Sequence, residues 1–149
     1  NQMLYDKCWN AREIMKKSIG ANNLNERDVF HGTKTIDVMG VVTTQGFRKE
    51  YTTTAMYGEG TYLARDAQYS AEAHGGYCGR DSNGVYQMFQ CRVMMGESHQ
   101  GQQQYGLRSW PTKQNGLIYD SLVNNPSNPE IFVIHENDRA YPMFIIYFQ

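Results

Sequence analysis

The chain has little of several features that mark common classes of protein. Its 14 basic and 15 acidic residues leave a net charge of −1, so no basic excess exists to neutralise a nucleic acid backbone. No apolar run approaches the length of a membrane span, and we expect no membrane partner. The three cysteines, Cys8, Cys78 and Cys91, are odd in number and far apart. With no signal peptide at the start, this favours an intracellular compartment, cytoplasmic or nuclear.

The motifs of several catalytic and binding classes are also missing. His74 and Cys78 lie four residues apart, and Cys91 and His99 follow, but structural zinc sites use two close pairs. We therefore predict no metal. No G-x-S-x-G nucleophile elbow occurs. The segment "YGEGTY" lacks the Gly-Lys-Ser/Thr ending of a phosphate-binding loop.

What the sequence does contain is enough apolar material for one domain. The chain has 149 residues, is 40% hydrophobic and holds 11 tyrosines. This length suits a single domain with a real core. Tyrosine is common in strands, and its flat face also suits a site that stacks rings. We find no repeat and no internal boundary.

The order of patterns predicts helices early and strands late. Apolar spacing predicts a helix over residues 3–19 that ends near Gly20 and, more weakly, a helix within "TIDVMGVVTTQG" (35–46) that is stopped by Gly46. A strand leads into a helix across 60–74. Strands are expected at 85–95, 130–135 and 141–148, the last two joined by "ENDRA" as an antiparallel pair, with Pro142 at a strand start or on an edge. This indicates an α+β domain with antiparallel sheets.

Two short segments stand out as candidate ligand sites. In "RDVFHGTKT", a short apolar strand ends at His31, and Gly32 permits close approach to the main chain. In "YGEGTYLA", glycines bracket the approach to Tyr62. From the residues alone, the simpler interpretation is that Tyr62 is an aromatic residue of a strand and belongs to the core.

The order of four motifs resembles a known family. "FHGT", "YGEGTYLARDAQYS", "YDS" and "NPEIFVIHENDRAYP" follow one another with similar gaps along nearly the whole chain. They resemble the catalytic domain of the poly(ADP-ribose) polymerase family, and more closely its mono-ADP-ribosyltransferase branch.

The resemblance implies a fold and a co-substrate. The fold is expected to be the ADP-ribosyltransferase fold, two packed antiparallel sheets flanked by helices, with residues 1–149 as a single catalytic domain. NAD⁺ would bind extended in a cleft between the sheets. The family fold has another strand and helical turn before the first helix. We therefore expect the chain to be shortened at its N-terminus.

The resemblance also assigns the residues around nicotinamide. Its carboxamide would bind the main chain of Gly32 and the side chain of Ser70, eight residues after Tyr62. His31 would bind a hydroxyl of the adjoining ribose, and Tyr62 would stack on the nicotinamide ring. Gly32 would then lack a side chain so that the flat amide can lie against the backbone.

Further NAD⁺ contacts are implied at three more positions. Thr33 belongs to the same segment as His31, and Arg48 matches an arginine on the adenosine side. Tyr77 is our choice for the second face of the nicotinamide ring, with His74 as the alternative. Glu59 stands where the family often has lysine, and a carboxylate close to the donor phosphates would repel them unless it faces solvent.

The third position of the family's catalytic triad is Ile131, where polymerases carry glutamate. Isoleucine accepts neither a proton nor a hydrogen bond, and the adjacent Glu130 points to the opposite face of a strand. The implied activity is the transfer of a single ADP-ribose to an acceptor, a protein side chain that can belong to the enzyme itself, with release of nicotinamide. Two alternatives are an inactive binding or scaffold module and a transferase acting on RNA ends, which the charge does not support.

Overall fold

The computed structural model describes residues 1–52, 55–72 and 76–149. Its helices are α1 (Gln2–Ile19), α2 (Ile36–Gln45) and α3 (Ala67–Glu72), with short 3-10 turns at Ala21–Asn23, Lys49–Tyr51 and Asn137–Arg139. The strands are β1 (Glu26–Gly32), β2 (Thr61–Ala64), β3 (Tyr86–Met94), β4 (Ser98–Gln100), β5 (Ser121–Val123), β6 (Ile131–Ile134) and β7 (Ala140–Phe148).

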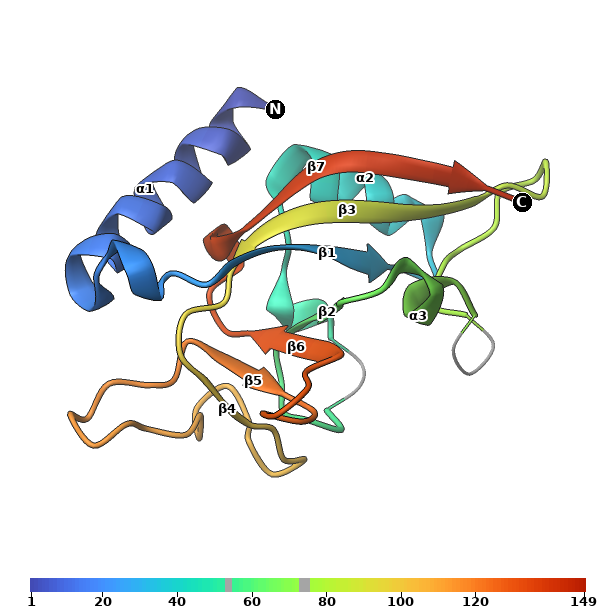
Figure 1. Ribbon diagram of the computed structural model, residues 1–149. Helices are drawn as coiled ribbons and strands as arrows, with labels where there is room; N and C mark the ends of the chain where they lie inside the picture. Colours follow the sequence, from blue (N-terminus) through green and yellow to red (C-terminus); the bar gives the residue numbers. More distant parts are fainter. Residues whose placement is uncertain (53–54, 73–75) are drawn as a thin grey trace.

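The strands form one seven-stranded sheet in the order β4-β5-β6-β2-β1-β3-β7 (Figure 1). We expected two separate sheets. The structure instead joins them through β1 and β2, which pair at Phe30 and Ala64. All neighbours are antiparallel except β4 and β5, which run parallel. The α+β class is confirmed, and the expected pair of sheets corresponds to two halves of one sheet.

The predicted pairing of the last two strands is wrong. β6 lies between β5 and β2, whereas β7 pairs with β3 at the far edge of the sheet. The connection contains a 3-10 turn at Asn137–Arg139 and carries the chain from one half of the sheet to the other. A loop of hairpin length therefore does not show that the two strands it joins pair with each other.

The helices follow the expected signals closely. The Asn1 side chain caps α1 by accepting the Leu4 amide at 3.4 Å, and Gly20 ends that helix with φ 86°. Gly46, with φ 84°, ends α2 in the same way. Pro142 lies in β7, where the register shifts opposite Gln90 and Cys91, on the edge strand that tolerates a missing amide.

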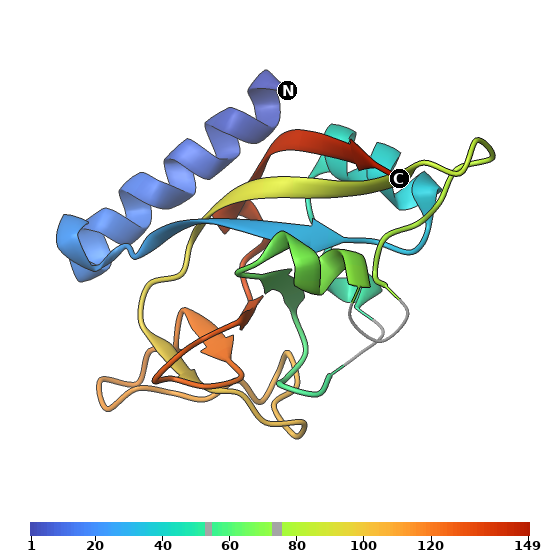
Figure 2. The same cartoon turned by 45° about the vertical axis from the view of Figure 1, so that its right-hand side comes forward.

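The core lies on the sheet where β1, β3, β2 and β6 meet α2. Its members are nearly all buried apolar side chains, among them Val29, Phe89, Cys91, Val93, Phe132 and Ile134. Helix α3 packs on the ends of β1 and β2, as Figure 2 shows. This places the predicted NAD⁺ residues of β1, β2 and α3 next to one another. Among the helices described here, none has the length and apolarity that a membrane crossing requires.

Candidate active site

Strands β1 and β2 diverge at the position where the sequence predicts the site. Their ladder, which lies wholly within the described residues, consists of the pair Phe30 and Ala64. Continued in the same register, Gly32 would lie opposite Tyr62. The backbone pairing does not reach that far, so the two strands open between His31–Gly32 and Tyr62. The pairing of β1 with β2 therefore stops at a defined point, beside a histidine and a tyrosine.

His31 spans the start of this opening. Its Nδ1 lies 2.7 Å from the carbonyl oxygen of Tyr62. Because a carbonyl only accepts, Nδ1 carries the proton, and Nε2 is the acceptor nitrogen of the neutral ring. Burial lowers the pKa of His31, against the opposing effect of the Tyr62 carbonyl. The Phe47 ring supports the imidazole edge-to-face at 5.0 Å. His31 is thus a fixed, neutral hydrogen-bond acceptor.

Tyr62 is held through its hydroxyl by the turn that precedes it. The phenol donates to the Gly58 carbonyl at 2.7 Å and accepts the Tyr57 amide at 3.0 Å. Burial raises the pKa of Tyr62 to about 12, so the phenol is neutral. With the hydroxyl fixed, the ring direction is fixed as well. The half-buried ring also packs against the cluster of Trp110, Leu122 and Val133.

Gly32 is required for a different reason from the one the sequence suggested. A Cβ added to it would lie 3.0 Å from Cys78 Sγ and 3.1 Å from both the backbone and Cβ of Tyr77. The side-chain direction of Gly32 is therefore filled by the chain itself, at a distance tighter than ordinary contact. The glycine lets the segment that carries Tyr77 pack onto the end of β1.

That segment is tied to α3 by its backbone. The Tyr77 amide donates to the Ser70 carbonyl at 3.0 Å, and the Gly79 amide donates to the Thr33 carbonyl at 2.6 Å. The thiol of Cys78 also donates to the Ser70 carbonyl, at 3.3 Å. Thr33, Ser70 and Tyr77, which the resemblance implies in NAD⁺ binding, are thus joined by hydrogen bonds, with Ser70 buried.

Tyrosines gather around Tyr62. The phenols of Tyr57, Tyr69 and Tyr77 are near enough to contribute to its raised pKa. Tyr77 stacks on Tyr69 at 6.0 Å between ring centroids with 14° between the planes, and Lys34 Nζ lies 5.9 Å from the Tyr77 centroid. Tyr69 was not predicted. The alternative to Tyr77, His74, lies outside the described residues.

Ile131 begins β6, is buried, and pairs with Ala64 of β2. The neighbouring Glu130 is turned away from the core and makes an ion pair with Arg65 at 3.3 Å. Arg65 also bonds the side chain of Asp66 at 3.0 Å and that of Asn128 at 2.8 Å. Glu130 is thus held on the surface. Its carboxylate is engaged by Arg65 and does not take the place of Ile131.

Arg48 is exposed and lies at the start of the turn after α2, directly after Phe47, whose ring packs on His31. Its guanidinium bonds the Gln45 side chain at 3.4 Å, lies 3.6 Å from Glu50 and stacks over the Tyr51 ring at 5.7 Å. The structure therefore brings together His31, Gly32, Thr33, Tyr62, Ser70 and Tyr77, with Ile131 on the neighbouring strand. The interactions of the Arg48 side chain are with its own segment.

Glu59 is exposed, and its side chain reaches the loop at Leu107. Its carboxylate accepts the amide of Leu107 at 3.0 Å, and its own amide donates to the Tyr105 carbonyl at 2.8 Å. No sequence signal identified this loop as a partner. The contact joins residues 48 positions apart and depends on how the chain folds back.

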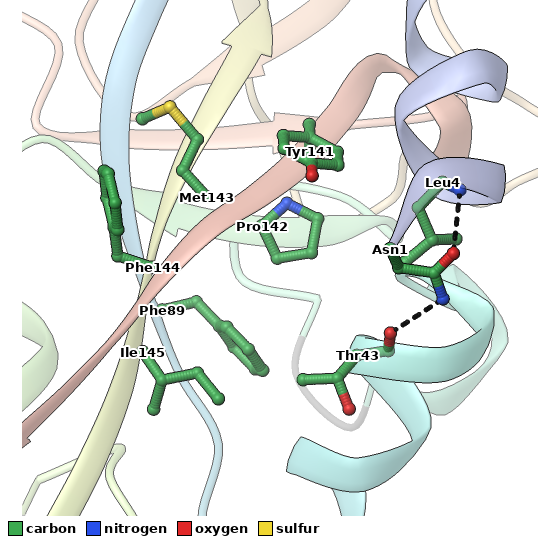
Figure 3. A pocket seen from close by; sticks show the side chains of 9 residues that line it. All are labelled: Asn1, Leu4, Thr43, Phe89, Tyr141, Pro142, Met143, Phe144 and Ile145. Carbon is green, nitrogen blue, oxygen red and sulfur yellow. Dashed lines mark hydrogen bonds between the residues drawn. The ribbon is translucent and has the colours of Figure 1, made fainter.

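A hollow in the described residues lies elsewhere. It has a volume of about 170 Å³ and lies between the start of α1, α2 and the edge strand β7 (Figure 3). Asn1 closes one side with a bond from its side-chain amide to the Thr43 carbonyl at 3.1 Å. Its walls are mostly apolar, and none of the predicted NAD⁺ residues lines it. Among the described residues, no group of three or more metal-ligating side chains occurs.

Known structures and sequences connect this geometry to one family. The structure resembles the crystal structure of the PARP domain of Arabidopsis RADICAL-INDUCED CELL DEATH1, with a TM-score of 0.79 over 98% of this chain and 79% of that one. At 24% identity, this similarity shows the fold alone. The profile of the poly(ADP-ribose) polymerase catalytic domain matches residues 6–149. The chain therefore belongs to the poly(ADP-ribose) polymerase catalytic-domain family, as its motifs predicted.

Several similar curated sequences are named as mono-ADP-ribosyltransferases. Human protein mono-ADP-ribosyltransferase PARP14 is 33% identical over 147 residues, which cover 95% of this chain and 8% of that protein. Human PARP12 is 34% identical, over 93% of this chain and 19% of that protein. Human PARP11 is 32% identical, over 99% of this chain and 48% of that protein. The predicted mono-ADP-ribosyltransferase branch is confirmed. The chain spans less than half the length of each of these relatives.

Proposed function

We propose that this domain transfers one ADP-ribose unit from NAD⁺ to an acceptor protein and releases nicotinamide. The observation that carries the proposal is the opening between β1 and β2, with His31 on one side and Tyr62 on the other. The family to which the chain belongs uses NAD⁺ as its substrate. The protein acceptor rests on the names of the relatives, and an intracellular location rests on cysteine usage.

The opening suits a flat amide beside a ribose. The backbone of Gly32, where the pairing of β1 with β2 stops, has an N–H donor and a carbonyl acceptor, which are the groups that a carboxamide needs. The ring of Tyr62 is fixed in direction and supplies a face for stacking. His31 Nε2, the acceptor of a neutral ring, matches a ribose hydroxyl, which donates.

The reaction then depends mainly on positioning. Cleavage of the bond between nicotinamide and ribose releases a neutral ring, and the ribose passes through an oxocarbenium-like transition state. Holding the leaving group and the sugar in one geometry lowers the barrier without a charged catalytic residue. With Ile131 at the third position, no protein carboxylate activates a ribose hydroxyl for chain growth. The acceptor supplies the nucleophile.

The test is nicotinamide release from NAD⁺ by the purified domain and by His31→Ala and Tyr62→Ala. We expect both variants to lose release by about 100-fold or more, because each removes a group that orients the reacting bond. Intact mass spectrometry of the acceptor should show one ADP-ribose per modified site. Glu13→Ala, at a half-buried position on α1, is the matched control and should leave release unchanged. A folded wild-type domain that binds NAD⁺ without releasing nicotinamide would refute the transferase and favour the binding module.

A further inference from the structure

The backbone amide of Leu107 is held from both sides by side chains that come from distant parts of the chain. The carboxylate of Glu59 accepts its N–H at 3.0 Å. His135 Nε2 donates to its carbonyl oxygen at 3.0 Å. We call this arrangement of Glu59, Leu107 and His135 the Leu107 clamp. It uses both hydrogen-bonding groups of a single residue in a half-exposed loop.

One end of the clamp is the turn that fixes Tyr62. Glu59 directly follows Gly58, whose carbonyl accepts the Tyr62 hydroxyl at 2.7 Å. Gly58 has φ 111°, and an added Cβ there would lie 2.6 Å from Leu122 Cδ1, so this turn has no room to shift. The carboxylate of Glu59 therefore extends the fixed geometry of Tyr62 to the loop at Leu107.

The other end of the clamp reaches the segment that carries Arg48. His135 packs edge-to-face on Trp110 at 4.9 Å, and Lys49 Nζ lies 3.2 Å from its Nδ1. The backbone amide of Lys49 is held in turn by the Asn137 side chain at 3.0 Å. Lys49 follows Arg48 directly in the chain. The clamp thus connects the segment of Tyr62 with the segment of Arg48.

We propose that Glu59 is a positioning residue for NAD⁺, which holds the Leu107 clamp closed and so fixes the distance between the nicotinamide and adenosine sides of the site. The inference rests on the proposed function, because it takes Tyr62 and Arg48 as contacts to the two ends of NAD⁺. In this role the Glu59 carboxylate favours NAD⁺ binding, whereas electrostatic repulsion of the donor phosphates would disfavour it. Reversal of the charge should therefore raise the Kd for the NAD⁺ analogue in the first case and lower it in the second.

The test compares Glu59→Lys and Glu59→Gln in the whole domain, with Glu13→Lys as the matched control. Glu13 pairs with Arg12 and Lys16 on α1, away from the clamp. The probe is carba-NAD⁺, which does not react, and its Kd is measured by calorimetry. We expect Glu59→Lys to raise the Kd about tenfold, the size of one lost charged hydrogen bond. Glu59→Gln, which retains an acceptor oxygen, should stay within about threefold of wild type.

Hydrogen exchange measures the Leu107 clamp independently of ligand binding. Hydrogen exchange of the Leu107 amide should be about tenfold faster in Glu59→Lys than in wild type, because its acceptor is gone. Binding of nicotinamide alone, which reaches one side only, should change less than binding of carba-NAD⁺.

The outcomes separate this inference from the proposed function. Tighter or unchanged carba-NAD⁺ binding in Glu59→Lys would overturn the positioning role and favour repulsion or no role. If wild type fails to bind carba-NAD⁺, the proposed function fails first, while exchange at Leu107 still reports whether the clamp forms. Equal weakening by Glu59→Lys and Glu59→Gln would also overturn the inference, because the retained acceptor should rescue binding.

Discussion

The two halves of the sheet are held together by different means. In the long-strand half, β1, β3 and β7, pairing between β1 and β3 runs without interruption from Glu26 to Gly32, and β3 pairs with β7 over most of its length. In the short-strand half, β4, β5 and β6, strands have three or four residues and are separated by long loops. The first half has long backbone ladders, whereas the second has ladders of three pairs each and a group of polar side chains.

The side chains of the short-strand half form a buried polar cluster. Asp120 accepts Lys113 Nζ at 2.8 Å, Arg139 Nη1 at 2.8 Å and the Glu97 amide at 3.0 Å. Ser98 and Ser121 share a hydroxyl hydrogen bond at 2.7 Å across β4 and β5. The candidate site lies between the two halves, with His31 from one and Ile131 from the other. Its geometry therefore depends on both means of stabilisation.

The largest effect is expected from breaking the polar cluster. Asp120→Ala leaves Lys113 and Arg139 without their shared carboxylate, and the side chain of Lys113 is only 9% exposed. Breaking a buried ion pair from one side costs about 3–5 kcal/mol. Urea unfolding should show this loss in the free energy of unfolding. A loss below about 1 kcal/mol would mean that the cluster is not what stabilises the short-strand half.

Ile131→Glu tests the same half through its apolar packing. It places a carboxyl on a side chain that is only 6% exposed, which we expect to cost about 2–4 kcal/mol. Ile131→Val is the control, with a cost of about 1 kcal/mol. Mass spectrometry should find single ADP-ribose units in all three proteins. Chain growth depends on the acceptor-site loops as well as on the third position, so efficient chain growth by Ile131→Glu alone would contradict this dependence.

Tyr62→Phe tests the strand that joins the halves. The ring remains, but the Tyr57 amide and the Gly58 carbonyl lose their partner. We expect a loss of about 1–3 kcal/mol in the free energy of unfolding. Nicotinamide affinity should fall less than in Tyr62→Ala, because stacking is kept. Equal loss of affinity in both variants would mean that the hydroxyl, and not the ring, carries binding.

A smaller effect is expected in the pH dependence of the free energy of unfolding, through the titration of His31. Burial holds its pKa below the ordinary value of 6.5, so the unfolded state binds the proton more readily. Stability from this residue is therefore complete above about pH 6.5 and falls as the pH drops below it, by at most about 1.4 kcal/mol per pH unit. His31→Gln, which cannot titrate, should remove this part of the slope. NAD⁺ binding should weaken only at lower pH, where the folded protein itself takes up the proton and Nε2 becomes a donor.

The smallest effect is expected from an ion pair of the long-strand half. Arg92 pairs with Asp28 at 2.9 Å across β3 and β1, with about half of each side chain exposed. Exposed pairs contribute about 0–1 kcal/mol, and the ladder holds these strands in any case. Arg92→Ala should leave the midpoint of urea unfolding close to that of wild type. A loss comparable to Asp120→Ala would remove the distinction between the halves.

The sequence predicted elements that depend on local signals. Gly20 and Gly46 end their helices because each adopts positive φ, which few other residues accept. Family motifs correctly grouped His31, Gly32 and Tyr62. The alternation of apolar residues in β3 likewise indicated a strand before any partner was known.

The sequence could not predict contacts that join distant segments. The contact of Glu59 with Leu107 and the stacking of Tyr69 on Tyr77 depend on loops whose path no local pattern encodes. The expected pairing of β6 with β7 failed for a similar reason, since strand order is set by packing across the whole sheet. The short strand β4 was missed because its three residues, Ser98–Gln100, are polar.

The divergence of β1 from β2 has a thermodynamic consequence. A ligand that binds between His31 and Tyr62 occupies the position where the pairing of β1 with β2 stops. Such a ligand would connect the two halves and would bind only the folded chain. By mass action, the free energy of unfolding of the domain would then rise with the concentration of the ligand. At a concentration 100 times the Kd, such a ligand adds about 2.7 kcal/mol to the free energy of unfolding. Under the proposed function, a cell that depletes NAD⁺ would thereby lower the free energy of unfolding of this domain as well as remove its substrate.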